Sequence, residues 1–198
     1  MKRTALAAAL LPCLALAASF DSGKTLGGTN SPIVLEVFSS FDCPHCKEMH
    51  DDLVPLLVRD YVTSGRVCLV NREFPLAGPN HPYSRAAALY ATAAARIGKY
   101  AAVADALWKN QGVWAVNGQV WETVATVLTA AEQKKVQALA KDPGVEAEVR
   151  HDIDEATRDR VDRTPSIFIT ANGRRFMLPG GVPRYELLAS VLKSYLGK

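Results

Sequence analysis

Residues 34–46 read VLEVFSSFDCPHC. The run Ile33–Phe38 is almost continuously apolar and has the length of a strand, as expected for a strand buried on both faces. Cys43 and Cys46 follow it three positions apart, and Pro44 between them suits the first turn of a helix. The stretch therefore predicts a buried strand that leads directly into a helix, with two cysteines where that helix begins.

The same pattern extends into a strand–helix–strand unit. The helix is predicted over residues 43–61, with a kink at Pro55, which lacks the N–H that would bond to the preceding turn. A second strand is predicted over residues 66–74, and the helical connection favours a parallel pairing of the two strands. A proline-rich loop, residues 75–82, ends the unit.

The rest of the chain divides into a helical block and a strand pair. Residues 83–161 show helical spacing without a strand signal, which predicts an inserted helical subdomain. Strand patterns return at residues 166–170 and 174–178, joined by Asn172-Gly173, a dipeptide that favours a two-residue hairpin turn. A helix over residues 183–195 completes an α/β fold in the order βαβ, helical insertion, ββα.

The composition is that of one compact domain. The chain has 198 residues, 48% of them hydrophobic and 22% charged, which is enough for one core but not comfortably for two. The net charge of +3 is spread along the chain, with no run of Lys or Arg suited to binding phosphates. Nucleic acid is therefore not expected as a partner.

The N-terminus has the pattern of an export signal. Lys2-Arg3 supply a positive start, residues 4–16 an apolar stretch, and Ala15-Leu16-Ala17 a cleavage site of small residues. We predict a signal peptide over residues 1–17 and a mature periplasmic domain over residues 18–198. An uncleaved anchor is the alternative, although the stretch falls just short of the roughly 17–25 apolar residues of a spanning helix.

The cysteines fit an exported redox protein. Cys13 lies within the signal, and lipid attachment there is disfavoured because Pro12 replaces the usual small residue. Removal of the signal leaves three cysteines, so at least one thiol is unpaired. Cys43 and Cys46 form the obvious pair. Cys68, in an apolar run, is predicted to be a small buried residue rather than a reactive one.

The spacing of Cys43 and Cys46 predicts redox chemistry. The unpaired N–H groups and the dipole at the start of a helix stabilise a thiolate on Cys43, which makes Cys43 the nucleophile. His45 is expected to lower the pKa of Cys43 further, as a cation or a hydrogen-bond donor. Cys46, deeper in the first turn, is expected to resolve the mixed disulfide. A Cys-x-x-Cys pair is a much stronger redox signal in this strand–helix context than alone.

Two other roles for the pair stay open. Zinc or copper would recruit the two cysteines with His45 and His50, but a structural zinc site generally needs a second ligand pair, which His81 and His151 do not supply. A purely structural disulfide is the other alternative, although so small a ring closes little chain and gains little entropy.

Four further residues are candidates for the site. Pro165, directly before a strand, predicts a cis peptide bond after Thr164, whose backbone would then be free to meet an incoming peptide. Glu36 would relay a proton if it faces the core beneath Cys46, and is otherwise a solvent-facing strand residue. Arg72, in the neighbouring strand, is the candidate counter-charge of Glu36.

These motifs together resemble the DsbA family of thioredoxin-fold proteins, over about residues 24–197. The helical block is matched only in pattern. The most specific matches are residues 34–46, Arg72-Glu73-Phe74-Pro75-Leu76, Arg163-Thr164-Pro165-Ser166 and Asn172-Gly173.

The resemblance implies a thioredoxin fold with a helical insertion at about residues 83–161. It also implies an enzyme that donates its disulfide to reduced exported client proteins. We further expect a monomer, without cofactor or metal. A quinone-linked membrane partner, similar to DsbB or VKOR, would reoxidise it. The family's roles fall on Cys43 as nucleophile, Cys46 as resolving thiol, Pro44 and His45 as redox-tuning residues, Thr164 and Pro165 as substrate contacts, and Glu36 as buried acid.

One position departs from the best-known members of that family. Thr164 stands where they carry Val, and Thr-Pro also occurs in isomerases and reductases of the superfamily. An exported reductase or isomerase is therefore the alternative enzyme, although no dimerisation domain is evident between the signal and Ile33. A metal-binding or peptide-holding module on the same fold is the alternative without catalysis.

Overall fold

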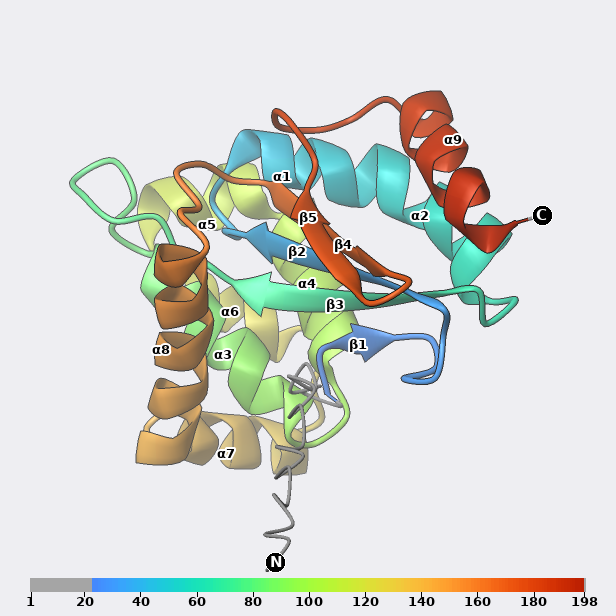
Figure 1. Cartoon of the computed structure of the whole chain (residues 1–198). Coiled ribbons are helices and arrows are strands. Elements are labelled where there is room, and N and C mark those ends of the chain that lie inside the picture. Colours follow the sequence, from blue (N-terminus) through green and yellow to red (C-terminus); the bar gives the residue numbers. More distant parts are fainter. Residues whose placement is uncertain (1–22, 198) are drawn as a thin grey trace, which may run out of the picture.

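The computed structural model describes residues 23–197 and confirms the predicted α/β fold. A five-stranded sheet in the order β1-β3-β2-β4-β5 crosses the molecule (Figure 1). Its strands are β1 (Thr25–Leu26), β2 (Ile33–Ser39), β3 (Val67–Glu73), β4 (Ser166–Ala171) and β5 (Arg174–Met177). β2 pairs with β3 in parallel, as predicted, and with β4 in antiparallel orientation.

One edge strand of the sheet, β5, was predicted from the sequence, whereas the other, β1, was not. β5 follows β4 through Asn172 and Gly173, whose φ values of 51° and 72° fit the predicted two-residue hairpin turn. β1 pairs with β3 in antiparallel orientation and was not predicted. Its two residues are too few to leave a periodic pattern in the sequence.

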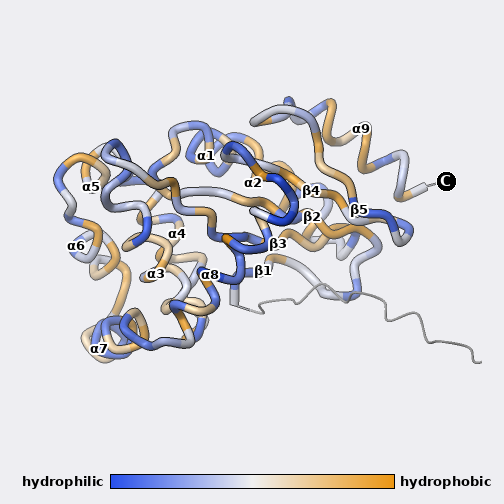
Figure 2. The backbone as a smooth tube through the Cα atoms, turned by 60° about the vertical axis from the view of Figure 1, so that its left-hand side comes forward, coloured by the Kyte–Doolittle hydropathy of each residue, from blue (hydrophilic) through white to orange (hydrophobic). Residues whose placement is uncertain are grey.

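One face of the sheet is covered by the helix of the cysteine pair and by α9 (Tyr185–Leu196) (Figure 1). The helix of the cysteine pair consists of α1 (Pro44–Glu48), η1 (Met49–Leu53), α2 (Val54–Leu57) and η2 (Val58–Val62). Here η marks a π-helical turn. Both elements pack on the inward side chains of β2 and β4. Figure 2 shows hydrophobic residues along these strands. This core includes Leu35, Val37, Leu53, Leu57, Ile169 and Leu188.

Pro55 does not end the first helix. It lies in α2, between the two π-helical turns, and in η1 the N–H of Val54 donates to the carbonyl of Met49, five residues back. Such widened turns, like prolines, bend helices and change the hydrogen-bond ladder locally. The helix therefore continues past the missing donor to Val62.

A helical insertion lies between β3 and β4 in the chain, mainly on the other side of the sheet (Figure 1). It comprises α3 (Ser84–Ala95), α4 (Tyr100–Lys109), α5 (Gln111–Asn117), α6 (Val120–Ala125), α7 (Ala130–Leu139) and α8 (Pro143–Arg158). Fully buried Ala87, Ala91 and Ala94 line the inner side of α3. Their small side chains let neighbouring helices approach closely, which explains the alanine-rich sequence.

The predicted signal peptide, residues 1–17, and Cys13 within it lie outside the described residues. Within residues 23–197, no helix combines the length and the apolar character needed to span a bilayer.

Cys68 is a buried core residue, as predicted. It is fully enclosed in β3, packs with Val34 and Val70, and burial raises the pKa of its thiol. We expect Cys68→Ser to lower the free energy of unfolding by about 1–3 kcal/mol, because it places a hydroxyl in apolar surroundings. Urea unfolding measures this loss. Redox turnover should stay near wild type, and its collapse in a folded variant would show that Cys68 belongs to the reaction.

Candidate active site

Cys43 and Cys46 lie at the N-terminus of α1, as predicted. Cys43 is the N-cap residue, with extended φ and ψ angles of −80° and 121°, and Pro44 is the first helical residue. The N–H groups of Cys46 and Lys47 both donate to the carbonyl oxygen of Cys43 at 3.1 Å. Both thiols are free, so the structure describes the reduced pair.

The two thiols differ strongly in acidity. A hydrogen bond from Cys46 is the largest cause that lowers the pKa of Cys43, to about 5. Burial opposes this effect, while Thr164 and the N–H groups of Cys46 and His45 add to it. Burial is the main cause that raises the pKa of Cys46, and the Cys43 sulfur raises it further. At neutral pH the pair therefore holds a thiolate on Cys43 and a thiol on Cys46.

His45 contacts the nucleophile through its backbone rather than its ring. The side chain is 74% exposed, and its Nδ1 lies 3.4 Å from Glu48 Oε2. The backbone N–H of His45, at the open end of the helix, is what favours the Cys43 thiolate. His45 and the exposed Pro44 thus form the surface beside the nucleophile.

Thr164 and Pro165 face Cys43 from the loop before β4. The Cys43 sulfur lies 3.4 Å from the carbonyl oxygen of Thr164, and the peptide bond between Thr164 and Pro165 is cis, as predicted. The Thr164 hydroxyl is buried and has no hydrogen-bond partner within residues 23–197, which leaves it available to the Cys43 thiolate. Two segments far apart in the sequence are thus brought together around one sulfur atom.

Glu36 is buried, but on the wrong face of the sheet for the predicted proton relay. Side chains alternate along β2, and Val37 packs toward the helix of the cysteine pair whereas Glu36 points toward α8. Glu36 Oε1 lies 2.9 Å from Arg72 Nη2, and Oε2 lies 2.6 Å from Arg175 Nε. The hypothesis that Glu36 lies beneath Cys46 is therefore wrong, whereas Arg72 is confirmed as its counter-charge.

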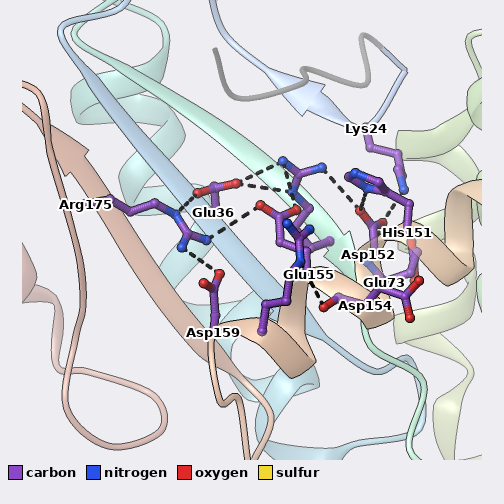
Figure 3. A network of polar contacts seen from close by, with 11 residues as sticks. Lys24, Glu36, Glu73, His151, Asp152, Asp154, Glu155, Asp159 and Arg175 are labelled. Carbon is purple, nitrogen blue, oxygen red and sulfur yellow. Dashed lines mark hydrogen bonds and ion pairs between the residues drawn. The ribbon is translucent and has the colours of Figure 1, made fainter. Parts of the chain in front are cut away.

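Glu36 instead belongs to a buried ion network (Figure 3). Arg72 also reaches Asp152, with 3.2 Å between Nη1 and Oδ1, and Asp152 Oδ2 lies 2.6 Å from Lys24 Nζ. Lys24, Glu36, Arg72 and Asp152 are each at most 2% exposed. Buried charges are tolerated only when they are paired. With Arg175 at its edge, the network ties β2, β3 and β5 to α8.

A second group of titratable side chains shares this region. Ligand atoms of His151, Asp152 and Glu155 lie within 4.8 Å of one another. Asp152 and Glu155 are already paired with Arg72, at 3.2 and 3.5 Å. Among the described residues, this group includes neither active-site cysteine, so it gives no support to the metal alternative for the pair.

A polar cluster beside the nucleophile was missed by the sequence analysis. The buried Asp42 accepts a hydrogen bond from Ser40 Oγ at 2.8 Å, and its Oδ2 lies 2.9 Å from His81 Nδ1. Ser40 Oγ also lies 2.8 Å from Ser84 Oγ. His81 thereby fixes the loop of residues 75–82 next to Cys43. An acidic residue directly before the cysteine motif was the signal available in the sequence.

Gln111 was missed as well. Its side-chain amide donates to the carbonyl oxygens of Phe41 and Cys43, at 2.7 and 3.0 Å, from a buried position in α5. The helical insertion therefore supports the turn that carries the nucleophile. One glutamine in a long helical block has no spacing pattern that would mark it.

Comparisons with known proteins agree with this geometry. The family model described as Thioredoxin matches residues 21–188. Probable disulfide bond formation protein D of Bacillus cereus is 24% identical over 163 residues, which cover 78% of this chain and 73% of that protein. A variant of α-DsbA1 from Wolbachia pipientis superposes with a TM-score of 0.73 at 19% identity, over 87% of this chain and 90% of that chain. A thioredoxin-like oxidoreductase from Silicibacter pomeroyi gives a TM-score of 0.66 at 27% identity, over 84% and 88%.

The chain belongs to the thioredoxin family, since the matched residues 21–188 span most of its length. Its cysteine pair, its helical insertion and its relatives show which kind of thioredoxin-family protein it is. It is a DsbA-like thiol–disulfide oxidoreductase.

Proposed function

We propose that this protein is an exported oxidase that introduces disulfides into reduced client proteins through Cys43 and Cys46. The observation that carries the proposal is the contrast between the two thiols, with the pKa of Cys43 lowered to about 5 and that of Cys46 raised. A thiol of low pKa is a good leaving group, and its stabilised thiolate makes the reduced state of the pair favourable. Such a pair passes its disulfide on readily.

The proposed reaction has two exchange steps. A client thiolate attacks the Cys43 sulfur of the oxidised pair, and Cys46 leaves with the bonding electrons and takes up a proton. A second client thiolate then attacks the client sulfur of the mixed disulfide, and Cys43 leaves as a thiolate. The client loses two electrons and gains a disulfide, and the enzyme ends in the dithiol state.

The surroundings of Cys43 suggest where clients bind. Thr164 and Pro165 border the nucleophilic sulfur on one side, and the exposed Pro44 and His45 border it on the other. We assign substrate-peptide contact to the first two residues and redox tuning to the second two, His45 acting through its backbone N–H. The backbone of Thr164, which lies 3.4 Å from the Cys43 sulfur, would meet the incoming chain.

Continued turnover requires an oxidant for the dithiol. By its likeness to the DsbA family, we assign this role to a quinone-linked membrane reoxidase similar to DsbB or VKOR, and we place the enzyme in the periplasm after removal of residues 1–17. The enzyme is proposed to act as a monomer, without a bound cofactor.

Two measurements test the direction of electron flow. The proposal expects rapid oxidation of a reduced, unfolded client and a reduction potential nearer to the value of about −120 mV for DsbA than to about −270 mV for thioredoxin. The alternative, an exported reductase or isomerase, is favoured by Thr164 and expects a potential near that of thioredoxin with efficient insulin reduction. A strongly reducing potential would overturn the oxidase proposal.

We expect Cys46→Ala to accumulate mixed disulfides between Cys43 and client proteins whose thiol is activated as a mixed disulfide, because the Cys43 thiolate displaces the activating group. The variant keeps the nucleophile Cys43, although without the hydrogen bond from Cys46 that lowers its pKa, and it lacks the thiol that would release a bound client. Non-reducing gels of the variant incubated with a client activated as a mixed disulfide show the adduct, and added dithiothreitol should remove it. A variant that also lacks Cys43 is the control, and adducts that persist in it would argue against Cys43 as the reactive sulfur.

A further inference from the structure

A small cavity borders Cys46, between the helix of the cysteine pair and the face of the sheet away from Glu36. Its volume of about 20 Å³ has room for one water molecule. Ser39, Cys46, His50 and Asn71 line it together with Val37, Met49, Val54 and Trp108. His50 is the one other titratable side chain among the described residues that form the wall.

His50 is held in a fixed position. It follows Cys46 by four residues, so the two side chains lie on the same face of the helix, about one turn apart. His50 Nε2 lies 3.1 Å from Asp105 Oδ1 of α4, and the ring stacks on Trp108 with 5.6 Å between centroids. A carboxylate that faces Nε2 keeps the hydrogen of a neutral imidazole on that atom. Nδ1 is then the nitrogen with a free lone pair.

The surroundings keep His50 in its basic form at neutral pH. Burial is the largest influence and lowers its pKa below the ordinary value of 6.5, and Lys47 acts in the same direction. Asp105 and Asp51 oppose these effects by favouring the imidazolium. The other titratable group that α4 brings close is Tyr100, which lines an adjoining cavity of about 60 Å³ and donates its hydroxyl to Glu73.

Cys46 needs a proton acceptor, because its own pKa is raised and it is a thiol at neutral pH. We propose that His50, positioned by Asp105, exchanges the proton of Cys46 across this cavity, directly or through one water. The inference rests on the proposed roles of Cys43 and Cys46. It moves to His50 the role that the sequence analysis had given to Glu36.

The step balances without any further reagent. When Cys46 resolves a mixed disulfide, its proton passes to His50 Nδ1 and its electron pair forms the bond to the Cys43 sulfur. The bond from Cys43 to the client sulfur breaks, and the client leaves as a thiolate with that electron pair. In the oxidising direction Cys46 is the leaving group, and it takes up a proton that His50 first receives from solvent.

Ellman's reagent separates the two cysteines in one experiment. In a Cys13→Ser background, the reduced protein should release thionitrobenzoate in two phases. The Cys43 thiolate attacks the reagent in the first, and Cys46 displaces thionitrobenzoate from Cys43 in the second.

We expect His50→Gln to slow the second phase by about 10-fold or more, as for other losses of a proton-transfer group, and to leave the first phase unchanged. His151→Gln, the exchange of an exposed histidine on α8, is the matched control and should leave both phases at the wild-type rate.

The two phases keep the proposals distinguishable. A wild-type protein without a first phase would overturn the proposed function. A normal first phase, with a second phase that His50→Gln leaves unchanged, would overturn the role of His50 alone.

The pH profile provides a second test that a merely structural role would not pass. In the wild type, the rate of the second phase should fall as pH drops through the pKa of His50, since the imidazolium cannot accept a proton. Asp105 favours the imidazolium, so Asp105→Asn should move this fall to lower pH. Asp105 is 69% exposed, which makes this exchange mild for the fold. Identical pH profiles for wild type and Asp105→Asn would overturn the proposal.

Discussion

A Cys43→Ser variant is expected to lose oxidation of client proteins down to the background rate of the assay. A serine hydroxyl forms no disulfide, and it cannot replace the thiolate whose pKa is lowered to about 5. The loss should be complete at every pH, because no other thiol in the described residues has a lowered pKa. Stopped-flow oxidation of a reduced model peptide, with the variant present in catalytic amount, measures it.

Cys68→Ser is the matched control for this experiment. It makes the same chemical change at a fully buried cysteine of β3 and should leave the rate of oxidation near wild type. Circular dichroism of both variants checks that the fold is kept. A Cys43→Ser protein that oxidises the peptide at a rate close to wild type would refute the assignment of the nucleophile.

The second large effect is that the stability of the reduced protein relative to the oxidised protein should depend on pH. The folded, reduced protein holds Cys43 with a pKa of about 5, whereas an unfolded cysteine has a pKa of about 8.5. A lowered pKa adds stability that is fully present above about pH 8.5 and is lost as pH falls through about 5. At pH 7 only the interval between the Cys43 pKa of about 5 and the ambient pH contributes, which is about two pH units. This interval corresponds to about 3 kcal/mol of added stability for the folded, reduced form.

The oxidised form has no such thiolate, but it gains about 2 kcal/mol from closure of a short ring. The reduced form should therefore be slightly the more stable at pH 7, and the oxidised form the more stable at about pH 4, a total change of about 3 kcal/mol. The greater stability of reduced DsbA follows the same logic. Urea unfolding of both forms across this range tests the expectation. An oxidised form that is the more stable by a constant margin at all pH values would favour a structural disulfide.

Much of the fold was predictable because its strands and helices leave local patterns. The apolar run of β2, the turn at Asn172-Gly173 and the helical spacing between residues 83 and 161 each specify one element without reference to the others. The cysteine pair is similarly local, since Cys43 and Cys46 lie within one helical turn. β1 escaped prediction because two residues of strand depend on their partner β3 and on nothing in their own sequence.

The rest of the candidate site depends on contacts between distant segments. Gln111 reaches the cysteine turn from α5, and His81 reaches Asp42 from a loop, so neither contact has a spacing that the sequence reveals. Glu36 is the converse case, because the sequence predicted a contact with the cysteine pair that the structure does not contain. Its position beside the cysteine motif suggested a proton relay, but the alternation of side chains along β2 directs it to the other face, toward Arg72.

The ion network of Lys24, Glu36, Arg72 and Asp152 also limits how this protein can evolve. Removal of one member of a buried charged group leaves its partner uncompensated, at a cost of about 3–5 kcal/mol, which is comparable to the whole stability of many domains. Replacement of the complete group by apolar residues of similar volume is often neutral. Single substitutions are therefore poor intermediates, and neutral change at one position requires near-simultaneous change at others. We therefore expect a lineage that keeps Arg72 to keep acidic residues at positions 36 and 152 as well.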